Sequence, residues 1–142
     1  MSVPPPIRLE HRQIYVNLPA ADLPKLREFY RALGWRLNET FSGEQTASFE
    51  VSDHIVVMLL ERGYFDSFHQ RESIEPRGPR EMLNALSASS ARDVDELIRR
   101  AREAGGTVFR EPEGQGPMYS AAFDDPEGHG WEVVYMDPAV LS

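Results

Sequence analysis

The chain contains no cysteine among its 142 residues. This absence excludes disulfide bonds, thiolate nucleophiles, and zinc or iron–sulfur sites that cysteine holds. No apolar run approaches the roughly 18 residues needed to cross a bilayer, so we expect no membrane partner. The opening residues 1–6 lack the apolar core and the cleavage pattern of a signal peptide, which makes the cytoplasm the expected location.

Basic side chains are fewer than acidic ones, with 15 Lys and Arg against 23 Asp and Glu, and the net charge is −8. Nucleic-acid binding needs a clustered basic face, so we expect no such partner. The arginines of 77–80 and 99–102 are diluted by proline, glycine and alanine, and we interpret them as solvated surface. The length and the 41% hydrophobic content predict one globular domain over 1–142, with a core of its own.

What the sequence does contain is a repeated pattern. An apolar stripe of helical spacing runs from Asp22 to Gly34, and a second stripe runs from Asp93 to Gly105. Every position of the second lies 71 residues after its counterpart in the first. We expect an aspartate to begin each helix and a glycine to end it. A repeat at this scale predicts two similar structural units.

Strand-like segments flank the two helices in the same order. One precedes each helix and three follow it, at 13–18, 35–41, 45–51, 54–61, 82–87, 107–111, 118–123 and 129–136. The predicted fold class is therefore α+β, with two βαβββ modules. Module one covers about 11–61, a linker covers 62–81, and module two covers about 82–138.

The closing segment, Phe123 to Asp137, places a carboxylate in an unusual setting. An Asp-Pro-Glu-Gly turn leads into a strand in which Glu132 shares a face with Gly130 and Val134. A carboxylate on an otherwise apolar strand is costly to bury without a partner. Glu132 is therefore either a surface residue on a half-exposed strand or part of a polar site.

The chain resembles the vicinal oxygen chelate superfamily in four features taken together. These are the two modules, the Ile-Tyr-Val-Asn-Leu-Pro start, the paired helices and the closing Asp-Pro-Glu-Gly-His-x-Trp-Glu segment. This group includes glyoxalase I, extradiol dioxygenases, and the fosfomycin and bleomycin resistance proteins. The resemblance covers roughly residues 10–138. It implies that the modules form a curved, cup-like mixed sheet around a central site, in a homodimer.

In enzymes of that superfamily a divalent metal sits in the cup, held by His, Gln or Glu on the first and fourth strands of each module. The matching positions here are Tyr15, Met58, Leu83 and Glu132. Hard cations bind oxygen and imidazole nitrogen, and only Glu132 is of the expected type. Asn17 adds one weak oxygen ligand to the Tyr15 face. We therefore expect no metal cofactor, and a register slip of one residue does not restore the ligands.

Several other residues have a structural and a functional interpretation. Tyr15 could hydrogen-bond Glu132, either to fix the register of the modules or to face a ligand. His129 could be a base or a ligand, but we expect it to be exposed at a turn; His54 could line the rim of the cup. The linker aromatics Tyr64, Phe65 and Phe68 could cover the cup or a dimer interface. The segment 114–117 lacks the lysine of a phosphate loop and is interpreted as a mobile loop.

Three functions follow as hypotheses. The first is a small-molecule-binding protein of the glyoxalase and bleomycin-resistance type that uses no metal. Its expected ligand-binding residues are Tyr15, Asn17, Met58, Leu83 and Glu132. The second is a lyase, isomerase or dioxygenase with a metal in a shifted site or with Glu132 as its catalytic base. The third is a scaffold for dimerisation or protein contact, with a small or filled cup.

Overall fold

The computed structural model describes residues 2–115 and 117–141. The first half contains β1 (Ile14–Ala20), α1 (Leu23–Ala32), β2 (Arg36–Leu37), a 3₁₀ turn (Glu39–Phe41), β3 (Thr46–Glu50) and β4 (Ile55–Glu61). A helix, α2 (Arg62–His69), follows. The second half contains β5 (Asn84–Ser87), α3 (Ala91–Glu103), β6 (Thr107–Gln115), β7 (Met118–Asp124) and β8 (Gly130–Met136), before the short α4 (Pro138–Leu141).

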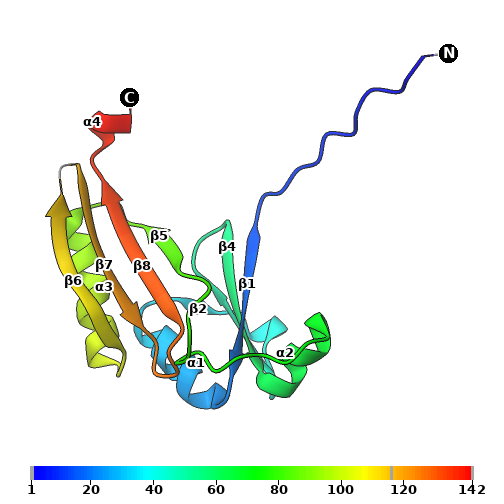
Figure 1. Cartoon of the computed structure of the whole chain (residues 1–142), viewed down its shortest axis with the longest axis horizontal. Helices are drawn as coiled ribbons and strands as arrows, with labels where there is room; N and C mark the ends of the chain where they lie inside the picture. Colours follow the sequence, from blue (N-terminus) through cyan, green and yellow to red (C-terminus); the bar gives the residue numbers. More distant parts are fainter. Residues whose placement is uncertain (1, 116, 142) are drawn as a thin grey trace.

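Each half forms a mixed four-stranded sheet of the same topology, which confirms the predicted pair of βαβββ modules. The strand orders are β1-β4-β3-β2 and β5-β8-β7-β6, and the first strand of each half lies parallel to the fourth. Figure 1 shows the sheets as two separate walls, with α1 at the base between them and α3 against the β6–β7 side. The residues before β1 lead away from both walls (Figure 1).

A single apolar cluster joins the two halves. One face of each sheet packs against α1 and α3, because alternate residues of the strands share a face. The cluster centres on Tyr30, which stacks on Trp35 at 4.8 Å between ring centroids and meets Trp131 edge-on at 6.3 Å. The opposite faces of the two sheets, which carry Met58 and Glu132, are left for other contacts.

The helix boundaries follow the sequence signals, with one correction. Asp22 caps α1 by accepting from the Lys25 N–H, and Gly34 follows the helix at a φ of 100°. Gly105 ends α3 in the same way, at a φ of 103°. Asp93, however, lies inside the first turn of α3. The N-cap is Ser90. Its hydroxyl accepts from the Asp93 N–H, a backbone donor in the first turn that has no partner within the helix.

Three predicted segments also take a different form. The expected strand 35–41 is only two residues long, since Asn38 caps a 3₁₀ turn that leaves Phe41 exposed. The linker 62–81 contains α2, a short amphipathic helix in which Phe68 lies three and four residues after Phe65 and Tyr64. The predicted loop 114–117 begins inside β6, with Gly114 opposite Tyr119; Gly116 lies outside the described residues. None of the described helices combines the length and apolarity that a membrane crossing requires.

Candidate functional site

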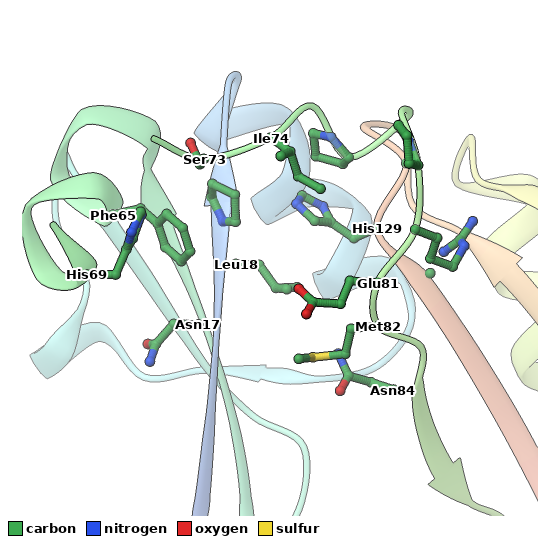
Figure 2. Close-up of a pocket in the computed structure, with 16 residues that line it drawn as sticks. Asn17, Leu18, Phe65, His69, Ser73, Ile74, Glu81, Met82, Asn84 and His129 are labelled. Atoms are coloured by element: carbon green, nitrogen blue, oxygen red, sulfur yellow. The ribbon is translucent and has the colours of Figure 1, made fainter. Parts of the chain in front are cut away.

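A cavity of about 340 Å³ lies where the two halves meet, and we call it the junction cavity. Figure 2 shows Phe65 and His69 of α2 on one side, His129 on the other, and Ile74 above. Its walls are mainly apolar, and this size and lining are typical of small-molecule sites. The lining residues are Asn17, Leu18, Pro19, Phe65, His69, Ser73, Ile74, Pro76, Pro79, Arg80, Glu81, Met82, Asn84, Gly128, His129 and Gly130.

A second hollow, of about 600 Å³, lies beneath α2, and we call it the α2 hollow. Its floor is the outward face of the first sheet, where Met58 is paired with Asn17 of β1. Its cover is the aromatic face of α2, so the linker aromatics do lie over the cup of module one. The two cavities share Asn17, Phe65 and His69. Asn17 therefore presents its amide at the boundary between them.

Arg62 holds the roof of the junction cavity in place. Its guanidinium donates to the Ser73 hydroxyl at 3.2 Å and to the Ile74 carbonyl at 3.4 Å. Further along the same segment, Arg77 donates to the Pro126 carbonyl, and Arg80 forms an ion pair with Asp124 at 2.8 Å. We interpreted Arg77 and Arg80 from the sequence as solvated surface. In the structure they attach the linker to module two, because the Pro126 carbonyl and the Asp124 carboxylate accept from them.

The closing turn is organised by a buried carboxylate, Asp125. Its Oδ1 accepts from the backbone N–H groups of Glu127, Gly128 and His129 at 2.9 to 3.0 Å. Its Oδ2 accepts from the Tyr30 hydroxyl at 2.6 Å and lies 2.7 Å from His129 Nδ1. Gly128 adopts a φ of 103° against the linker backbone, where a side chain would collide. The turn therefore connects α1, the linker and β8.

Burial and hydrogen bonding act in opposite directions on Asp125. Burial alone raises the pKa of this carboxyl group. The hydrogen bond and charge of His129, the Tyr30 hydroxyl and the His129 N–H outweigh burial, and the pKa lies below the ordinary 3.8. Burial, followed by the charge of Asp125 and its hydrogen bond, raises the pKa of Tyr30 well above 10.0. Asp125 is therefore ionised and Tyr30 neutral at neutral pH.

His129 is not at an exposed turn mouth, as we expected from the sequence. Its side chain is only 8% exposed, because Asp125 draws the ring inwards beneath the linker. Its Nε2 is buried and has no hydrogen-bond partner among residues 2–115 and 117–141. The prediction for His54 also differs from the structure: this residue is exposed in the turn before β4, with Nδ1 3.2 Å from the Arg12 carbonyl oxygen.

The predicted hydrogen bond between Tyr15 and Glu132 does not form. Tyr15 is 56% exposed and donates its hydroxyl hydrogen at 2.6 Å to Gln13, which immediately precedes β1. It lines a third hollow, of about 460 Å³, together with Met58. Glu132 belongs to the other sheet. The structure therefore brings Tyr15, Asn17 and Met58 onto one surface and leaves Glu132 on another.

Glu132 has a partner that the sequence analysis missed. Arg110 on β6 donates to Glu132 at 2.5 Å and to the Ser120 hydroxyl at 2.8 Å, across three neighbouring strands. Both side chains of the ion pair are about a quarter to a third exposed. The pairing of Arg110 with Ala122, and of Ala122 with Glu132, creates this contact. Leu83 lies beside Gly130 and is 42% exposed, rather than facing a central site.

The four positions that the resemblance assigns to a metal do not form a suitable donor set. Tyr15 and Met58 lie on one sheet and Glu132 on the other, and the carboxylate of Glu132 is engaged by Arg110. Within the described part of the chain, no group of three or more His, Cys, Asp or Glu side chains could hold an ion. These residues do not fit the divalent site of the enzymes.

Comparisons with known proteins agree with this fold. Residues 12–133 match the family model described as "Glyoxalase/Bleomycin resistance protein/Dioxygenase superfamily". No curated protein matches the chain. Among solved structures, the hypothetical protein SA1046 from S. aureus is 28% identical, with a TM-score of 0.74 over 87% of this chain and 93% of that one.

Two other solved structures have lower sequence identity to this chain, and their similarity shows the fold alone. A glyoxalase/bleomycin resistance protein/dioxygenase family enzyme from Burkholderia phytofirmans is 18% identical, with a TM-score of 0.73 over 86% of this chain and 96% of that one. Lactoylglutathione lyase from Agrobacterium tumefaciens is 21% identical, with a TM-score of 0.62 over 94% and 96% of the two chains.

Proposed function

Because the chain belongs to the glyoxalase/bleomycin resistance protein/dioxygenase superfamily, we propose that it binds a small organic molecule in the junction cavity without the metal of the related enzymes. The observation that carries this proposal is the cavity itself, about 340 Å³ in volume, with mainly apolar walls and a few polar groups. Asn17, at the boundary with the α2 hollow, orients the ligand, and Met58 lines the floor of that hollow.

The site proposed here is smaller than the one expected from the sequence. Asn17 stays in it, whereas Met58 lines the neighbouring α2 hollow and Tyr15 the third hollow. Glu132 lies on β8 of the second sheet and Leu83 just before β5, and neither takes part. A Glu132-dependent lyase, isomerase or dioxygenase receives no support from this arrangement, because Arg110 occupies the carboxylate. A homodimer remains part of the proposal, with the exposed faces around Tyr15 and Leu83 as the surfaces that a second copy covers.

A cavity-filling variant tests the proposal. Met82 lines the junction cavity, whereas Met136 lies at the end of β8 outside its lining; both side chains are exposed. We expect members of a metabolite and antibiotic library to raise the melting temperature of the wild type, since a ligand of the native state stabilises it. Met82→Trp should abolish this shift and Met136→Trp should preserve it. The proposal is wrong if no compound stabilises the protein, or if Met82→Trp binds as the wild type does.

A further inference from the structure

The two histidines of the junction cavity differ in how their nitrogens are used. In His69, Nδ1 accepts from the Arg71 N–H at 3.1 Å and Nε2 lies 3.0 Å from Asp66 Oδ1, so both nitrogens are engaged. In His129, Nδ1 lies 2.7 Å from Asp125 and Nε2 is buried with no partner among the described residues. A buried polar atom without a hydrogen bond is costly, and native proteins seldom keep one without a role.

Asp125 determines which nitrogen of His129 carries the hydrogen. An ionised carboxylate only accepts hydrogen bonds, so Nδ1 of His129 must be the donor. In the neutral ring Nε2 is then a bare acceptor. Asp125 itself is fixed by three backbone N–H groups and by the Tyr30 hydroxyl, which prevents it from turning away. The closing turn therefore holds Nε2 in a constant orientation, and in the neutral ring this nitrogen is an acceptor.

The His129 ring lines the cavity, whose walls are mainly apolar. Figure 2 shows the His129 ring reaching inwards between Ile74 and Leu18, with Phe65 towards the far side. A ligand that meets Nε2 of the neutral ring must supply a hydrogen-bond donor, which excludes a carboxylate at that point. Arg80 is already paired with Asp124 at 2.8 Å, and the carboxylate of Glu81 is exposed to solvent, which screens its attraction for a cation. A neutral donor also costs less to desolvate than an ammonium group.

We propose that His129 Nε2 accepts the hydroxyl hydrogen of a phenol or enol ligand whose ring lies against the apolar walls of the junction cavity. This inference rests on the proposed function and adds the chemical class of the ligand. No proton transfer is required, since a hydrogen bond from the hydroxyl satisfies the buried nitrogen. Leu18, Ile74 and Phe65 supply the surface against which a planar ring packs.

The test compares 2-naphthol with its methyl ether, 2-methoxynaphthalene, which has the same ring system and no donor. Binding is measured by calorimetry on the wild type, on His129→Asn and on His54→Asn. His129→Asn keeps an N–H that can donate to Asp125 and removes Nε2, whereas His54→Asn makes the same change at an exposed ring. Loss of one hydrogen bond should weaken 2-naphthol about fivefold to tenfold in His129→Asn. The methyl ether should change less than about twofold, and His54→Asn should bind both as the wild type does.

A second measurement needs no variant and covers the case in which His129→Asn fails to fold. Long-range ¹H–¹⁵N spectra of the wild type should show His129 with its hydrogen on Nδ1, and 2-naphthol should move the Nε2 resonance far more than the methyl ether does. The inference is wrong if the two compounds bind equally well and Nε2 does not respond; the cavity proposal then survives. If neither these compounds nor any library member binds, both proposals are overturned.

Discussion

The outward faces of the two sheets share a backbone design and differ in chemistry. The face of the first sheet carries Asn17 and Met58 at the hollow beneath α2, with an ion pair between Arg36 and Glu50 towards its edge. The matching face of the second sheet carries the ion pair between Arg110 and Glu132, which Ser120 extends. Repetition of a module thus preserves strand order and leaves the side chains free to diverge. The part of the first face around Asn17 and Met58 can receive a ligand, whereas the matching part of the second face is occupied by the Arg110–Glu132 ion pair.

The largest effect should come from the buried network that holds the two faces in their relative positions. Asp125→Ala leaves the Tyr30 hydroxyl, the His129 ring and three backbone donors without their acceptor. We expect a loss of about 3–5 kcal/mol in the free energy of unfolding, as for other broken buried charge networks.

Urea unfolding measures this loss. The exposed Asp53 provides a matched control, since Asp53→Ala should change stability by less than about 0.5 kcal/mol. Equal, small effects of the two substitutions would show that the Asp125 network does not join the halves.

Acid should weaken the same junction. The pKa of Asp125 is lower in the folded protein than its ordinary value of 3.8, so the ionised carboxylate stabilises the fold above that pH. This contribution is lost as the pH falls from 3.8 through the folded value. Unfolding measured in steps from pH 6 downwards should show a decline in the wild type that is shallower in Asp125→Asn. A wild type and variant with parallel pH profiles would contradict the assignment.

A smaller effect is expected from the ion pair on the second sheet. Glu132→Gln should cost about 1 kcal/mol, since the pair is partly exposed and loses one charged partner. Replacing Arg110 and Glu132 together by methionine should recover most of this loss. Neither change should alter ligand binding. Reduced 2-naphthol binding in Glu132→Gln would place the ligand on the second sheet after all.

Metal analysis sharpens the comparison without any change in the chain. After incubation with Zn²⁺, Mn²⁺, Ni²⁺ or Fe²⁺ and dialysis, we expect no stoichiometric metal, because Arg110 holds the carboxylate that the family site would need. The melting temperature should also stay unchanged. One metal ion per chain in the wild type, lost in Glu132→Ala, would overturn this account of the second face.

Tyr15→Phe should have the smallest effect. Its hydroxyl donates to the exposed Gln13 and not to Glu132, so we expect a change of less than about 0.5 kcal/mol in unfolding. A loss of several kcal/mol in the free energy of unfolding, measured by urea titration, would instead support the predicted hydrogen bond between Tyr15 and Glu132.

Much of the fold could be predicted from the sequence because its signals are local. The helices are marked by apolar spacing and by Gly34 and Gly105, and the repeat carries the strand order from one half to the other. The start of α3 was misplaced because Ser90 and Asp93 are both good caps. The helix α2 was missed because eight residues give too short a periodic pattern.

The site depended on contacts that sequence patterns do not encode. Glu132 on β8 was recognised as needing a partner. Its partner Arg110 lies on β6, on the far side of β7, and the β6–β7 register is shifted around Arg110, so sequence spacing does not predict the contact. His129 follows a turn, which normally means exposure. Asp125 reverses this by drawing the ring inwards, and only the tertiary position of Tyr30 reveals that the carboxylate is buried.

The methionines offer the most direct test of where a ligand binds, because they mark both regions. Met82 lines the junction cavity and Met58 the α2 hollow, whereas Met118 and Met136 lie on the strands of the second sheet. In protein labelled with ¹³C at the methionine methyl groups, 2-naphthol should shift the Met82 resonance most and Met58 less. Met118 and Met136 should not move. Shifts confined to Met118 and Met136 would contradict the central claim that the ligand lies between the halves and not on the Glu132 face.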